Sequence, residues 1–178
     1  MNDLHNWQRH SQEFYFYVGR CILKYQGVED FLKFVFASAL RKDTTEIEKL
    51  YSSADNSLGR KYEFIEIALA PRGSEDEVIS WVDLRAKIQR AADQRNTIAH
   101  SQPVIYGGGV ALDLGANPPT ATKLGPQQWQ ARKKTKTGNV TIVTLNDLKL
   151  FMSELEQLES ELQKFTQLLR ENNLAGKV

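Results

Sequence analysis

This chain of 178 residues contains one cysteine, five prolines and no long apolar run. Cys21 alone cannot form an internal disulfide framework, and its apolar neighbours Ile22 and Leu23 predict a buried thiol. No segment approaches the roughly 20 apolar residues of a membrane-spanning helix, and the polar segment 1–10 lacks the apolar stretch of a signal peptide. We therefore expect a soluble, cytoplasmic protein with no membrane partner.

The chain also lacks an excess of either charge. Lysine and arginine together number 23, and aspartate and glutamate number 22, so the bulk charge indicates no polyanionic partner. A single domain is the expectation at this length, which is sufficient for a substantial core. Any nucleic-acid partner must therefore be bound by a local cluster of charge.

Apolar residues recur at helical spacing up to about residue 102, which predicts an α-helical fold. The first pattern covers 6–25 and resumes over 28–39, so that Gly27 marks a kink or a break. Residues able to cap a helix predict where four further helices begin. These are Thr45 with Glu48, Ser57 before 58–70, Ser74 with Glu77, and Thr144 with Asp147. The predicted class is all-α, a bundle of four or five helices in one domain over 1–178.

The last predicted helix carries a narrow apolar seam with alternating spacings of three and four residues. Such a seam requires a partner helix. It packs either within the chain's own bundle or against a second copy of the chain, and the sequence leaves both interpretations open. Its members are Leu148, Phe151, Leu155, Leu158, Leu162, Phe165 and Leu169.

Residues 103–144 differ in kind from the rest of the chain. Short segments at 104–106, 110–114 and 140–144 predict a small β-hairpin or three-stranded insertion before the last helix. The insertion contains five basic residues against one acidic residue, and a tryptophan lies beside the basic cluster. One interpretation is that the cations bind a phosphate backbone while a base stacks on the indole, and the other is a solvated loop. The candidate nucleic-acid-binding residues are Trp129, Arg132, Lys133, Lys134 and Lys136.

An arginine interrupts the apolar face of the helix predicted over 74–101. Arg95 lies about 20° from the middle of this face at 100° per residue, where a guanidinium is costly unless it is paired or lies in a wet cleft. His100 follows in the last turn, and Asn96 stands one turn before it. Arg95, Asn96 and His100 are therefore the candidate site residues. The apolar face consists of Trp81, Leu84, Ile88, Ala91, Ala92, Ile98 and Ala99.

The pattern Arg95-Asn96-x-x-x-His100, followed by Ser101 at the end of a long helix, resembles the signature of the HEPN superfamily (higher eukaryotes and prokaryotes nucleotide-binding domain). The segment 57–70 is similar to the helix before that motif in the mannitol operon repressor family. The resemblance covers residues 10–102 and the last helix, whereas the insertion has no counterpart.

The resemblance implies a homodimer whose two motifs face one another across a cleft. For an active member it implies a metal-independent endoribonuclease of the toxin–antitoxin or RNA-based defence type. Arg95 and His100 would then be the catalytic residues, and Asn96 their polar neighbour. RNA would be the substrate, and an antitoxin or regulatory protein would be a further partner.

The residues themselves suit this chemistry. A histidine titrates near neutral pH and can act as base or acid, while an arginine presents a fork of donors to phosphate oxygens. No acidic or Cys/His cluster has metal-ligand spacing, so we expect no metal and no other cofactor. His5 and His10 are expected to be plain surface residues.

Two other interpretations remain open. In the first, Arg95 pairs with an acid such as Glu29, Asp30 or Glu63, and His100 is a favourable cation at a helix C-terminus. In the second, the chain is a non-catalytic regulator or scaffold that binds a protein or a nucleotide in the same cleft.

Overall fold

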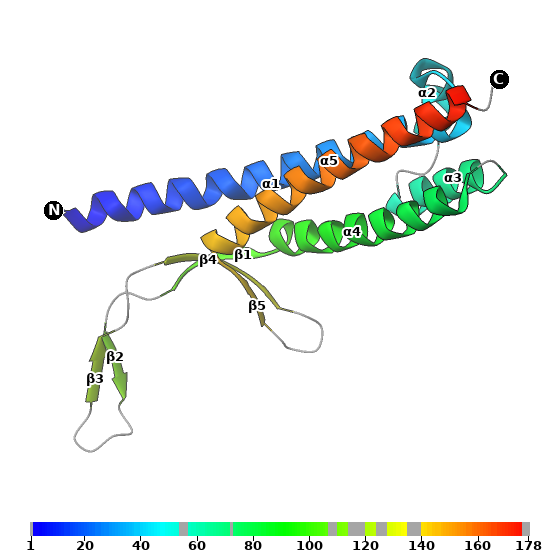
Figure 1. Cartoon of the computed structure of the whole chain (residues 1–178). Coiled ribbons are helices and arrows are strands. Elements are labelled where there is room, and N and C mark those ends of the chain that lie inside the picture. The colour runs from blue at the N-terminus through cyan, green and yellow to red at the C-terminus, as the bar shows by residue number, and fades with distance from the viewer. Residues whose placement is uncertain are drawn as a thin grey trace. The chain divides into compact units, whose positions relative to one another are not determined.

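The computed structural model describes residues 2–53, 57–71, 73–106, 110–113, 120–123, 128–134 and 140–175. Helices dominate these ranges, which confirms the predicted all-α class with a β insertion before the last helix (Figure 1). The helices are α1 (Asn2–Leu40), α2 (Thr44–Ser53), α3 (Leu58–Leu69), α4 (Glu75–Ala99) and α5 (Leu145–Ala175). The strands are β1 (Gln102–Tyr106), β2 (Val110–Asp113), β3 (Thr120–Lys123), β4 (Gln128–Lys134) and β5 (Val140–Val143). No described helix combines the length and the apolar character needed to cross a bilayer.

The chain divides into two compact units. The bundle unit consists of Leu23–Asp93 and Ser153–Val178, and the sheet unit consists of Met1–Ile22 and Gln94–Met152. Helices α1, α4 and α5 each contribute residues to both units. A single domain over the whole chain stays a prediction.

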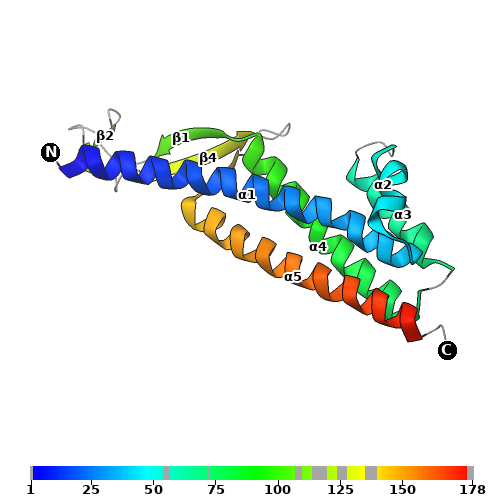
Figure 2. The same cartoon turned by 90° about the horizontal axis from the view of Figure 1, so that it is seen from above.

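Aromatic contacts join the helices of the bundle unit. Trp81 of α4 stacks on Phe165 of α5 with ring centroids 6.2 Å apart, and Tyr62 of α3 meets Trp81 edge-on at 6.0 Å. Phe36 of α1 stacks on Phe64 of α3 at 5.5 Å. Within this unit α1 and α5 run side by side (Figure 2). Ring contacts therefore connect α3 to α1 and to α4, and α4 to α5, and such contacts contribute more than the buried area of the rings alone.

A buried ion pair connects α3 to α1 in the same unit. Lys61 Nζ lies 2.6 Å from Glu29 Oε1, and the two side chains are only 9% and 11% exposed. The Lys61 ammonium also lies 5.9 Å from the centre of the Tyr51 ring. Because a buried charge is strongly unfavourable without a partner, each member of this pair requires the other.

Helix α1 continues through Gly27, so the predicted break there is wrong. A Cβ at this position would meet nothing within 4 Å, and no close approach of another segment explains the glycine. Tyr25 and Val28, on either side, are both buried. Packing of these neighbours therefore overrides the weak helix propensity of glycine.

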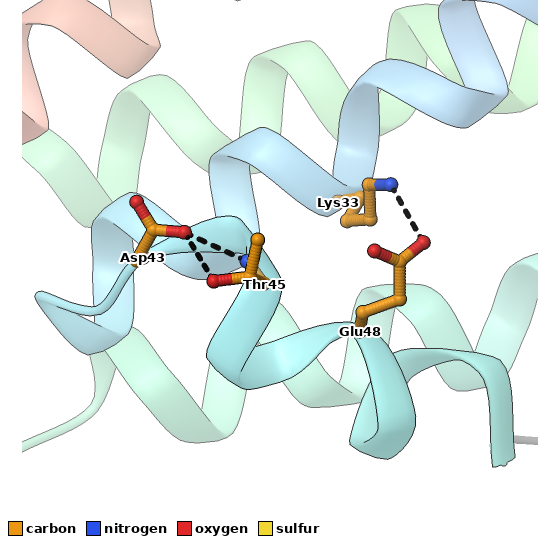
Figure 3. Close-up of polar contacts among 4 residues, drawn as sticks. All are labelled: Lys33, Asp43, Thr45 and Glu48. Atoms are coloured by element: carbon orange, nitrogen blue, oxygen red, sulfur yellow. Dashed lines mark hydrogen bonds and ion pairs between the residues drawn. The ribbon is translucent and has the colours of Figure 1, made fainter.

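Asp43 caps α2, and the predicted capping box of Thr45 with Glu48 is wrong (Figure 3). Asp43 Oδ1 accepts hydrogen bonds from the backbone N–H and the hydroxyl of Thr45 at 2.8 and 2.7 Å. These bonds hold the pKa of the Asp43 carboxyl below its usual value. Glu48 instead forms an ion pair with Lys33 of α1 at 3.3 Å. The helix begins at Thr44, so the cap position falls on a carboxylate, a strongly preferred N-cap group.

The other three predicted helix starts are confirmed by hydrogen bonds at their caps. Two of them are capping boxes, in which the side chains at both ends of a four-residue segment accept from one another's backbone N–H groups. The bonds are Arg60 N to Ser57 Oγ at 3.4 Å, Ser74 N to Glu77 Oε2 at 2.7 Å, Glu77 N to Ser74 Oγ at 3.3 Å, Thr144 N to Asp147 Oδ2 at 2.7 Å, and Asp147 N to Thr144 Oγ1 at 3.3 Å.

The apolar seam of α5 is covered by the chain itself. None of its seven members is more than 4% exposed in the single chain. Of the two interpretations that the sequence leaves open, packing within the chain's own fold is therefore the one observed. A second copy of the chain is not needed to bury this face.

The sheet unit contains a three-stranded antiparallel sheet in the order β1-β4-β5, and β2 pairs with β3 in a separate hairpin (Figure 1). The predicted strands near 104, 110 and 140 are confirmed, while β3 and β4 are strands that the local pattern does not predict. Pro103 lies in β1, an edge strand, where the missing N–H of proline is tolerated.

The core of the sheet unit includes the predicted buried thiol. Cys21 is fully buried and its Sγ lies 3.4 Å from the Leu148 carbonyl oxygen, to which it donates. Burial raises the pKa of this thiol from 9.0 to about 11. Other buried members of this core are Phe14, Ile98, Val143 and Phe151.

Candidate functional site

The candidate site residues lie where α4 ends, in the sheet unit. The final turn closes with hydrogen bonds from His100 N to the Asn96 carbonyl at 3.1 Å and from Ser101 N to the Ile98 carbonyl at 3.2 Å. The Ser101 hydroxyl also donates to the Thr97 carbonyl. Extended geometry follows at once in β1, because the residue before Pro103 is disfavoured in a helix. The last turn of α4 thus fixes the positions of Arg95, Asn96 and His100 immediately before β1.

Arg95 is half-buried, in agreement with its predicted position on the apolar side of the helix. Its Nη1 donates to the Asn96 side-chain oxygen at 2.9 Å. This acceptor is a neutral amide, so the bond orients the guanidinium without neutralising its charge. The geometry therefore fits a positively charged group held in place at a partly open surface.

His100 is exposed. In the part of the chain that the structure describes, its imidazole forms no hydrogen bond or ion pair. Ala99 is exposed as well, so its predicted place on the apolar face is wrong, whereas the other six members of that face are buried. The helix leaves the core after Ile98, and Ala99 and His100 face solvent.

Asn96 interacts with its two neighbours in the motif in different ways. Its side-chain oxygen accepts from Arg95, and its backbone carbonyl accepts from the His100 backbone N–H. The expected spacing of one helical turn between Asn96 and His100 is therefore observed, while the amide itself is directed at the arginine. This arrangement makes Asn96 a positioning residue for Arg95.

The acids proposed as alternative partners of Arg95 all lie in the bundle unit. Glu29 pairs with Lys61 as described above, and Glu63 pairs with Arg60 of the same helix at 2.9 Å. Asp30 accepts a hydrogen bond from Gln26 at 3.0 Å. Each of these carboxylates thus has a partner of its own.

Four of the five candidate nucleic-acid-binding residues lie on β4: Trp129, Arg132, Lys133 and Lys134. For them the interpretation as a solvated loop is wrong, because β4 pairs with β1 on one side and with β5 on the other. Lys136 lies outside the described residues. The β-propensity of this sequence does not predict a strand, because what stabilises β4 is backbone pairing with a neighbour on each side.

The register of the sheet relates this basic strand to the motif. Gln102, the first residue of β1, is the partner of Arg132. Strand β4 extends past this pair with Lys133 and Lys134. Because the two strands are antiparallel, these lysines continue on the side of Gln102 from which the chain arrives after His100. Antiparallel partners have Cα atoms about 4.5–5.5 Å apart. The basic end of β4 and the end of α4 are therefore neighbours in the backbone of the sheet unit.

His10 of α1 is less exposed than its polar surroundings in the sequence predict. It is half-buried, and its Nδ1 is buried with no hydrogen-bond partner among the described residues. The expectation of a plain surface residue is therefore wrong, while the side chain of His5 lies outside the described residues. The signal was present in the sequence, because His10 precedes the buried Phe14 by one helical turn and so shares its face.

Two further findings bear on the site. Within the described ranges, no group of three or more His, Cys, Asp and Glu side chains is placed to share a metal ion. In the comparisons with known proteins, no family model, no curated protein and no solved structure matches this chain.

Proposed function

We propose that this protein is a HEPN-like, metal-independent endoribonuclease that acts through Arg95, Asn96 and His100. The observation that carries the proposal is that the end of α4 presents both an exposed imidazole, His100, and a half-buried guanidinium, Arg95, that is oriented by Asn96. The basic strand β4 supports binding of an RNA backbone, because its Arg132 pairs with Gln102, which follows the end of α4 closely in the chain.

The chemistry requires no group that the motif lacks. His100 accepts the proton of the ribose 2′-hydroxyl, whose oxygen forms a bond to phosphorus while the bond to the 5′-oxygen breaks. The imidazole of a second copy donates the proton to the leaving oxygen, which is why we propose that the active form is a homodimer. Arg95 donates to the phosphate oxygens as charge develops there, and Asn96 holds the guanidinium. The products are a 2′,3′-cyclic phosphate and a 5′-hydroxyl.

The test is incubation of the full-length protein with a mixed pool of single-stranded and structured RNA in EDTA. His100→Ala and Arg95→Ala are compared with the wild type, and Arg90→Ala is the control, because Arg90 is an exposed arginine on the same helix. We expect the wild type and Arg90→Ala to cut the RNA. The two motif variants should lose about 10²–10⁴-fold in rate, the range for a general acid or base.

Circular dichroism and light scattering of the same samples separate chemistry from folding. Folded, dimeric motif variants without activity support the proposal. Unfolding of both motif variants favours the structural account, in which the arginine and histidine stabilise the end of α4. Intact RNA with the wild type contradicts the ribonuclease and favours a non-catalytic regulator that binds an antitoxin, another protein or a nucleotide.

A further inference from the structure

The bundle unit contains a surface cavity of about 500 Å³ where α1 ends and α2 begins. Its charged lining consists of three cations, Arg41, Lys42 and Arg170, and one acid, Asp43. Cavities of this size are typical of sites for small molecules. The excess of positive charge indicates that an occupant is an anion.

The two arginines are available to an anion. Lys42 forms an ion pair with Glu46 at 2.7 Å, whereas Arg170 uses only its Nε, which donates to Ser38 Oγ at 3.2 Å. Among the described residues, neither Arg41 nor Arg170 has a carboxylate within ion-pair distance. Asp43 keeps its negative charge in the lining, and its Oδ1 is held by Thr45 at the start of α2 (Figure 3). Three cations against this one acid still leave the lining with an excess of positive charge.

The backbone at Arg41 points to a role for its side chain. Arg41 has φ 59°, in the left-handed region, at the residue that follows α1. The turn is closed by bonds from Arg41 N to the Ser38 carbonyl at 3.1 Å and from Lys42 N to the Ala37 carbonyl at 3.0 Å. Glycine is the usual residue at such a helix end, because it adopts this conformation without steric cost. An arginine here accepts backbone strain, and Arg41 is one of the residues that line the cavity.

An aromatic ring provides an apolar part of the wall. Phe34 precedes Arg41 by two helical turns on α1, lines the cavity and is 37% exposed. The buried Ala37 continues the same wall. Asn173 of α5, which also lines the cavity, donates to the Ser38 carbonyl at 2.8 Å and so fixes α5 against α1. The cavity thus combines two arginines, of which Arg170 is held by Ser38, with a partly exposed ring.

We propose that this cavity binds a small organic phosphate, with its phosphate held by Arg41 and Arg170 and its flat apolar body against Phe34. The planar forks of arginine match phosphate oxygens, and an aromatic face favours a flat ligand. The site lies entirely in the bundle unit and does not depend on the ribonuclease proposed for the motif in the sheet unit.

The experiment is calorimetric titration of the full-length protein with phenyl phosphate, and with phenol and inorganic phosphate for comparison. We expect saturable binding of one phenyl phosphate per chain, weaker binding of inorganic phosphate and none of phenol. Arg41→Gly is the decisive variant, because it removes the guanidinium and supplies the residue that suits φ 59°. Its melting temperature should not fall, while its affinity should fall at least about tenfold.

Two further variants complete the test. Arg170→Gln should weaken binding by a similar factor, and Arg90→Gln should leave it unchanged, because Arg90 is exposed on α4 and does not line the cavity. Absence of binding by the wild type, or equal affinity in Arg41→Gly and Arg90→Gln, would overturn the proposal. Binding to phosphatidylcholine vesicles that contain phosphatidic acid, without binding of phenyl phosphate, would overturn the assignment of a soluble ligand.

Discussion

The bundle unit and the sheet unit hold their elements together by different means. In the bundle unit, side chains connect the helices through stacked rings and a buried ion pair. In the sheet unit, backbone ladders hold β4 between two partners although its sequence is mostly polar and charged. One chain therefore combines a region specified by side-chain packing with a region specified by strand pairing.

The largest effect is expected from breaking the ion pair inside the bundle unit. Glu29→Leu leaves the Lys61 ammonium buried without its partner and should reduce the free energy of unfolding by about 3–5 kcal/mol. The matched control is Glu63→Leu, which breaks an ion pair whose side chains are 59% and 56% exposed and should cost about 1 kcal/mol or less. Urea denaturation followed by circular dichroism measures both.

A double variant sharpens this result. Glu29→Leu with Lys61→Met replaces both charges by apolar groups and should recover most of the lost stability, because no buried charge remains. If the double variant is as unstable as Glu29→Leu, the ion pair is not the cause of the loss.

The second prediction concerns the reactivity of the buried Cys21 thiol in the core of the sheet unit. With the pKa of Cys21 raised from 9.0 to about 11, the thiolate fraction near neutral pH falls about a hundredfold, and burial adds a steric barrier. A thiol-specific disulfide reagent should therefore react with the folded protein at least about a hundred times more slowly than with the urea-unfolded chain. Equal rates would mean that the core of this unit is open in solution.

The same thiol predicts a pH dependence of stability. Because the folded state has the higher pKa, it retains the proton more strongly than the unfolded chain. The contribution of Cys21 is fully present below pH 9.0 and is lost as the pH rises through about 11. Cys21→Ala should abolish this part of the alkaline decrease in urea stability.

The smallest loss of stability is expected from removing one helix cap in each unit. Ser74→Ala, in the bundle unit, should cost about 1–2 kcal/mol, because its box partner Glu77 is buried and also accepts from Asn172 of α5 at 2.8 Å. Thr144→Ala, in the sheet unit, removes an exposed cap and should cost about 0.5–1 kcal/mol. Equal losses of urea stability in the two variants would show that the contact with α5 adds nothing.

Much of the candidate site follows from local sequence. The capping box at Ser74 and the proline at 103 bracket α4, and the helical period places Arg95 toward the half-buried side. The bond from Arg95 to Asn96 joins adjacent residues and depends on side-chain rotamers that no periodicity describes. The exposure of Ala99 depends on where the core stops, which is a property of the packed structure.

Local sequence is sufficient to predict the helical class, three of the four cap sites and the apolar seam of α5, because caps and periodic apolar faces act over only a few residues. Local sequence did not predict that α1 continues through Gly27, or that a strand with three basic residues lies between β1 and β5. Tertiary structure decided these features. Each depends on contacts between residues distant in the chain, or on backbone bonds whose partners the local pattern does not specify.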